Sequence, residues 1–78
     1  MNHEMRLHQK PFDQIKSGIK TIEARVNDEK RRQLNVGDTI TFKLRDHEDV
    51  TFTAEIVKLE LFPTFYQMKL VEMSNVLD

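Results

Sequence analysis

Residues 39–45 read Thr-Ile-Thr-Phe-Lys-Leu-Arg, and this stretch carries the clearest structural signal in the chain. Apolar and polar residues alternate strictly, so Ile40, Phe42 and Leu44 share one side of an extended chain and the polar residues share the other. Such alternation is typical of a half-buried β-strand. We therefore expect a fold built on a sheet that has one apolar face.

Two segments before this stretch repeat the same two-residue period. Residues 3–8 place Met5 and Leu7 on one side, which predicts a strand. Residues 20–26 predict another, with three apolar residues on one side and three polar residues on the other: Ile22, Ala24 and Val26 against Thr21, Glu23 and Arg25.

After the central stretch, a polar hairpin loop is expected at residues 46–49, followed by a long strand. Its apolar positions first fall on Val50, Phe52, Ala54 and Ile56, and the phase then changes to Val57, Leu59 and Leu61. A strand whose apolar side switches predicts a β-bulge or a sharp bend.

Helical segments are expected between the strands. A short helix over residues 11–17 is predicted from the spacing of Phe12 and Ile15, and Gly18 is suited to end it. Asn27 and Asp28, both suited to capping, predict a short basic helical turn over residues 29–33. Apolar residues at helical spacing predict a last helix that begins at Pro63 or Thr64 and ends near residue 75: Phe65, Met68 and Val71.

The chain is predicted to form one domain, residues 1–78, because 78 residues are too few for two cores. The order of elements indicates an α+β fold. We expect a small, curled antiparallel or mixed sheet, or a barrel, of about four or five strands with about two or three short helices.

Composition excludes several kinds of function. The chain has no Cys, which rules out disulfides, thiolate metal sites and a cysteine nucleophile. His3, His8 and His47 lack the spacing of metal ligands and are expected to be solvated. No apolar run is long enough to span a membrane, and a net charge of -1 implies no general attraction to polyanions. A cytoplasmic protein without metal or cofactor is expected.

One motif stands out from this background. Gly18, Lys20, Glu23 and Arg25 are spaced as G-x-K-x-x-E-x-R. This motif resembles the signature of the ASCH domain, named for activating signal cointegrator homology. The resemblance covers about residues 3–70 and includes three further stretches: His3-Glu4-Met5-Arg6-Leu7, Pro11-Phe12 and Val36-Gly37-Asp38.

The resemblance implies a PUA-like fold that binds RNA or a modified nucleoside in a cleft. On that reading Lys20 faces a phosphate or base oxygen, Arg25 supplies a planar fork, and Glu23 orients Arg25 or accepts from a base amino group. Thr21 adds a hydroxyl at the wall of the cleft. From the residues alone, Tyr66 is a candidate for stacking on a base.

The same resemblance leaves an enzymatic alternative open. Some small ASCH-like proteins are amidohydrolases that remove the acetyl group from N4-acetylcytidine, using a lysine, a threonine and a glutamate. Lys20 matches the lysine, but Glu23 stands at the position of the threonine. Thr21 is expected on the opposite side of the strand from Lys20. The catalytic candidates are then Lys20 and Glu23, and three residues compete for the downstream glutamate: Glu55, Glu60 and Glu72.

Two further interpretations stay open. Lys30, Arg31 and Arg32 form a basic run that either lies on a solvated helix face or contacts backbone phosphates. A protein-interaction domain with a vestigial cleft is the third functional alternative. Relatives continue past the last predicted helix into a closing strand, so a chain without that strand is expected to have an open sheet edge and to self-associate weakly.

Overall fold

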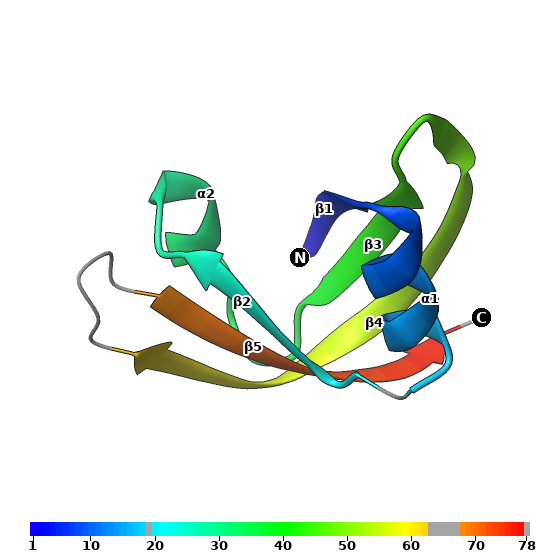
Figure 1. The fold of residues 1–78 in the computed structure, drawn as a ribbon. Coiled ribbons are helices and arrows are strands. Elements are labelled where there is room, and N and C mark those ends of the chain that lie inside the picture. The colour runs from blue at the N-terminus through cyan, green and yellow to red at the C-terminus, as the bar shows by residue number, and fades with distance from the viewer. Residues whose placement is uncertain (19, 63–67, 78) are drawn as a thin grey trace.

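The computed structural model describes residues 1–18, 20–62 and 68–77, without the side chains of residues 26, 62 and 75–77. Seven elements follow one another along the chain: β1 (Asn2–Leu7), α1 (Gln9–Lys16), β2 (Ile22–Val26), α2 (Glu29–Arg32), β3 (Thr39–Leu44), β4 (His47–Phe62) and β5 (Met68–Leu77). The strands form one mixed sheet in the order β1-β3-β4-β5-β2 (Figure 1). The prediction of a small α+β fold with a curled sheet is confirmed.

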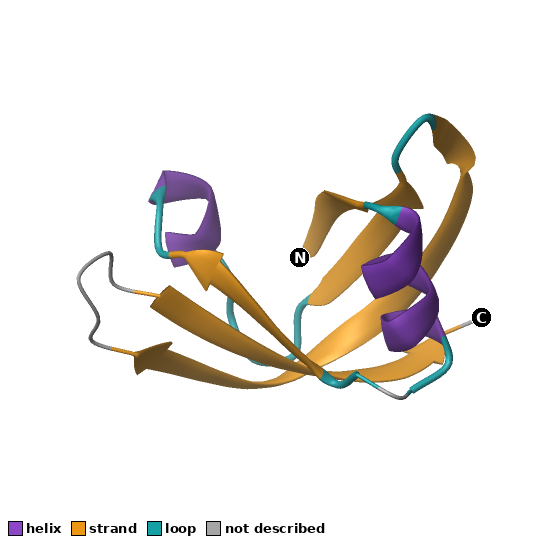
Figure 2. Cartoon of the chain, viewed as in Figure 1, coloured by secondary structure: helices purple, strands orange, loops and turns teal. Residues whose placement is uncertain are grey.

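The sheet is open, so the barrel alternative is wrong. β1 and β2 are its two edge strands. β1 runs parallel to β3, and every other neighbouring pair is antiparallel. The short helices α1 and α2 lie beside this curled sheet (Figure 2). Self-association through the open edges stays a prediction.

A single core joins the sheet to α1. Ile40 and Phe42 of β3 are fully buried, which confirms the prediction for residues 39–45. The Phe52 ring of β4 stacks on Phe42 at 5.1 Å between centroids and meets the edge of Phe12 of α1 at 4.9 Å. Ile15, one turn further along α1, is also buried. These contacts fix α1 against β1 and β3.

α1 ends just before Gly18, the glycine predicted to end it. α1 begins at Gln9, two residues before the predicted start, and its last residue is Lys16. Gly18 has a φ of +83°, the left-handed conformation that glycine adopts without steric cost. The backbone N–H of Lys20 then donates to the carbonyl of Gln14 at 3.0 Å. The turn therefore aims the chain directly into β2.

Neither helix of the described residues has the length and apolar character to cross a membrane.

The β3–β4 connection is shorter than the predicted four-residue loop. β3 ends at Leu44 and β4 begins at His47, with Asp46 at a φ of 71° between them. β4 shifts its register against β5 at two places, between Thr53 and Glu55 and between Ile56 and Lys58. These irregularities confirm the predicted bulge.

The change of phase in β4 turns fewer apolar side chains inward than predicted. Of the three apolar side chains predicted to turn inward after the change of phase, Leu59 packs against the core. Val57 and Leu61 are exposed, as is Val50 at the other end of the strand.

The last element is a strand, so the predicted C-terminal helix is wrong over residues 68–75. Residues 63–67, including Phe65 and Tyr66, lie outside the described residues. β5 bonds to β4 on one side and β2 on the other, and buries Val71 and Met73 at two-residue spacing. The three-residue spacing of Met68 and Val71 had predicted a helix. Pairing with two neighbouring strands instead makes this segment a strand. The described chain thus ends in a strand, contrary to the predicted helical end.

Candidate functional site

β2 turns its polar side inward, in contrast to the other strands. Glu23 is only 9% exposed, whereas Ile22 is 45% exposed and Ala24 is also exposed. Because β2 is an edge strand next to β5, its inner side extends past the apolar core. The polar side chains of β2 therefore face an opening of the fold instead of the core.

That opening is a hollow of about 310 Å³ between β1 and β2, here called the cationic hollow. The residues that line it come from the end of β1, the start of α1, β2 with its approach, and the β3–β4 turn: Arg6, Leu7, His8, Pro11, Lys20, Glu23, Arg25 and Arg45.

Backbone hydrogen bonds hold these segments in place. The β2–β5 register sets Glu23 opposite Val71 and Arg25 opposite Lys69. On the other side of the hollow, the N–H of Arg45 donates to the carbonyl of Leu7 at 2.8 Å, which ties the β3–β4 turn to the end of β1. The parts of the wall contributed by β1 and β2 therefore belong to the paired sheet, which fixes their backbone.

Lys20 and Glu23 form an ion pair at the β2 wall. The Nζ of Lys20 donates to Oε1 of Glu23 at 3.4 Å, and the same oxygen accepts from the N–H of Ala24 at 3.2 Å. The Glu23 side chain is 12% exposed and that of Lys20 is 37% exposed. The carboxylate is thus fixed, while the ammonium keeps access to solvent.

Arg25 is the least satisfied polar group of the hollow. Its Nε is buried and has no hydrogen-bond partner among the described residues, and its side chain is half-buried. Two other buried atoms also lack a hydrogen-bond partner among the described residues: Oδ1 of Asn27, which directly follows β2, and Nε of Arg31 in α2. A buried donor without a partner costs about 1–3 kcal/mol, so native structures contain few.

The hollow is strongly positive although the chain as a whole has a net charge of -1. It is lined by four basic residues and one acidic residue: Arg6, Lys20, Arg25 and Arg45 against Glu23. Arg6 also forms a two-pronged ion pair with Glu48 at 2.8 and 3.2 Å, and the Glu48 carboxylate raises the pKa of its guanidinium. Convergent positive charge attracts anionic ligands.

The structure brings Lys20, Glu23 and Arg25 into one hollow. Thr21 is exposed and does not line the hollow; its carbonyl oxygen instead accepts from the N–H of Met73 at 2.8 Å. Sequence reasoning did not single out Arg45, His8 or the other residues contributed by β1 and α1. Arg6 stands inside the stretch that resembles the ASCH family, which was the one signal available for it.

His3 is buried, so the expectation that all three histidines are solvated is wrong. Its Nε2 lies 2.8 Å from Asp38 Oδ2, and Asp38 also accepts from the N–H of Asn35 at 3.1 Å. The His3 ring, the N-terminal amine and Asn35 together lower the pKa of Asp38 to about 2. This cluster ties the start of β1 to the turn before β3. Across the described part of the chain, no three His, Asp or Glu side chains gather as they would around a metal ion.

Comparison with known proteins supports the fold and the family. No curated protein matches the chain at a significant level. The crystal structure of "hypothetical protein PH0355" is similar, with a TM-score of 0.81 and 21% identity over 97% of this chain and 100% of the other. At this identity the similarity shows the fold alone. The model of the ASCH domain family matches residues 5–75, and the chain belongs to that family.

Proposed function

We propose that the cationic hollow binds one nucleotide of a single-stranded or modified RNA and breaks no bond. Membership of the ASCH family is consistent with an RNA-binding module generally. The observation that carries the proposal is the convergence of four basic side chains on a hollow that holds one carboxylate. Lys20, Glu23 and Arg25 are the groups proposed to contact the nucleotide.

Arg25 is proposed to recognise the ligand through its planar fork. Its guanidinium donates no hydrogen bond to a described residue, and its buried Nε is unpartnered. A guanidinium matches two acceptor atoms at once, either on a phosphate or on the edge of a base such as guanine. Ligand binding would therefore satisfy donors that have no partner among the described residues.

Lys20 and Glu23 are proposed to contact different groups of the nucleotide. The ammonium of Lys20, partly exposed, suits a phosphate or a carbonyl oxygen of a base. The fixed Glu23 carboxylate is an acceptor only, which suits an exocyclic amino group. Thr21 is given no role, because it does not line the hollow.

The size and walls of the hollow suit one nucleotide held loosely. Its volume of about 310 Å³ lies at the lower end of the roughly 300–1,000 Å³ typical of small-molecule pockets. Leu7 and Pro11 supply the apolar part of the wall. No Phe, Tyr or Trp is among the described residues that line it. Tyr66, the stacking candidate from the sequence, lies outside the described residues.

Deacetylation of N4-acetylcytidine is the enzymatic alternative. Its lysine and one carboxylate lie in the hollow, where Lys20 and Glu23 are 3.4 Å apart. The lining residues that the structure describes contribute no hydroxyl to act as a nucleophile. The threonine that the resemblance implies for this reaction therefore has no counterpart among these lining residues.

Fluorescence anisotropy with random-sequence single-stranded RNA of about eight nucleotides tests the proposal. Arg25→Ala and Lys20→Ala are expected to weaken binding at low salt about tenfold or more, because each loses a charge-assisted hydrogen bond of about 1.5–3 kcal/mol. Lys58→Ala is the matched control, since Lys58 is exposed on β4 and does not line the cationic hollow. It removes the same charge and is expected to bind nearly as the wild type does.

Three outcomes decide the matter, with thermal melts showing that each variant is folded. Folded Arg25→Ala and Lys20→Ala proteins that bind as tightly as the wild type would refute the site. Equal losses in Lys58→Ala and Arg25→Ala would indicate non-specific attraction instead. Incubation with N4-acetylcytidine, followed by chromatography, is the enzymatic arm, and deacetylation that Lys20→Ala abolishes would replace the binding-only interpretation.

A further inference from the structure

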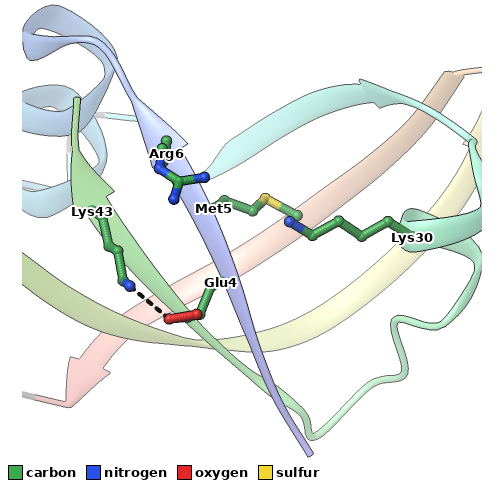
Figure 3. Close-up of a pocket in the computed structure, with 5 residues that line it drawn as sticks. All are labelled: Glu4, Met5, Arg6, Lys30 and Lys43. Atoms are coloured by element: carbon green, nitrogen blue, oxygen red, sulfur yellow. Dashed lines mark ion pairs between the residues drawn. The ribbon is translucent and has the colours of Figure 1, made fainter. Parts of the chain in front are cut away.

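A second, smaller hollow adjoins the cationic hollow. It measures about 90 Å³ and lies between β1, β3 and α2 (Figure 3). Five residues line it: Glu4, Met5, Arg6, Lys30 and Lys43. Arg6 lines both hollows, which places the two beside each other along β1.

Most of the charged side chains that line the second hollow form ion pairs, and Lys30 is the exception among the described residues. Lys43 Nζ contacts Glu4 Oε2 at 2.8 Å, and Arg6 is paired with Glu48. Lys30 has no ion pair among the described residues. The pKa of Glu4 is lowered, first by the hydrogen bond and charge of Lys43 and then in part by Arg6 and Lys30.

α2 fixes the base of the Lys30 side chain. Asp28 caps α2 by accepting from the N–H of Arg31 at 3.0 Å, and Lys69 of β5 donates to the Arg31 carbonyl at 3.0 Å. From this anchored turn the Lys30 side chain extends toward Met5 of β1 (Figure 3). Lys30 is therefore the one member of the basic run that lines this hollow: Arg31 is paired with Asp28 at 3.1 Å, and Arg32 is exposed.

We infer that Arg6 and Lys30 form a phosphate subsite for the nucleotide next to the one in the cationic hollow. This inference rests on the proposed function and narrows its ligand to a continuous single strand, as distinct from a free nucleoside. The second hollow is far smaller than the roughly 300–1,000 Å³ of ordinary ligand pockets, so it suits a phosphate group and not a base. A lysine ammonium on a flexible stem is a point charge that suits phosphate.

The dependence of RNA affinity on salt concentration provides the sharpest test. Each neutralised phosphate of a single strand contributes about 0.7 to the slope of log affinity against log salt, through counterion release. With the random-sequence RNA, Lys30→Ala is expected to reduce the slope by about this amount and to weaken binding several-fold at low salt. Lys30→Glu is expected to weaken binding further. Lys58→Ala serves again as the matched loss of one lysine.

The fold should tolerate these changes, because Lys30 is exposed and forms no ion pair with another described residue. Arg45→Ala, an exposed change in the cationic hollow, serves as the reference. If Arg45→Ala and Arg25→Ala weaken binding while both Lys30 variants match the wild type in affinity and slope, the subsite is refuted and the proposed function stands. If the wild type binds no RNA, the proposed function fails and the subsite fails with it. A reduced slope in the Lys30 variants but not in Lys58→Ala supports the subsite.

Discussion

β3 and β2 have the same alternating pattern and use it in opposite ways. In β3 the apolar residues Ile40 and Phe42 are fully buried. In β2 the apolar Ile22 is 45% exposed, and the polar Glu23 is the buried residue. β3 lies between two strands, whereas β2 is an edge strand that walls the cationic hollow. The comparison teaches that alternation reveals two faces, and that only the neighbouring elements decide which face is turned inward.

The largest effect is expected from Phe42→Ala in β3. Truncation of a fully buried aromatic ring that stacks on Phe52 should lower the free energy of unfolding by about 3–5 kcal/mol. Ile22→Ala in β2 should cost at most about 1 kcal/mol, because Ile22 is largely exposed. Urea unfolding followed by circular dichroism measures both. Similar losses in the two variants would mean that β2 contributes to the core as β3 does.

Glutamine at the inward position of each strand sharpens the contrast. Ile40→Gln places an unpaired amide in the core, and it should cost about 3 kcal/mol or more. Glu23→Gln should change stability by less than about 1 kcal/mol, because the ion pair that it breaks has a partner more than a third exposed. Its amide oxygen still accepts from Ala24 N–H. Unfolding midpoints decide the question, and a large loss in Glu23→Gln would make Glu23 a structural residue.

The smallest effect is expected at the turn before β3, and it depends on pH. The hydrogen bond to His3, aided by the N-terminal amine and Asn35, lowers the pKa of Asp38 from its ordinary 3.8 to about 2. The folded state therefore binds this proton less readily than the unfolded state. The stabilisation is complete above about pH 4 and is lost as the pH falls toward about 2.

Unfolding curves of the wild type and Asp38→Asn over that pH range test this account. The variant should be less stable at neutral pH and should lose less stability on acidification. Identical pH profiles would show that the acid sensitivity arises from other carboxylates. Any effect of the variant on RNA affinity is expected to be slight, because Asp38 does not line the cationic hollow.

The sequence by itself determined the features that local chemistry controls. Strict alternation over residues 39–45 identified a buried strand, because no other conformation gathers Ile40, Phe42 and Leu44 on one side. Gly18 marked the end of α1, since its positive φ is costly for other residues. The spacing of Lys20, Glu23 and Arg25 likewise placed the motif in and just before one strand, and the resemblance to the ASCH family pointed to the same residues.

Only the tertiary structure decided the features that depend on distant neighbours. The three-residue spacing of Met68 and Val71 predicted a helix, and hydrogen bonding to both β4 and β2 made β5 a strand. Arg6 and Arg45 are remote in sequence from the motif, and the curl of the sheet brings them to the same hollow. Burial and electrostatic fields act through space, so the inward turn of the polar side of β2 follows from the packing around that strand.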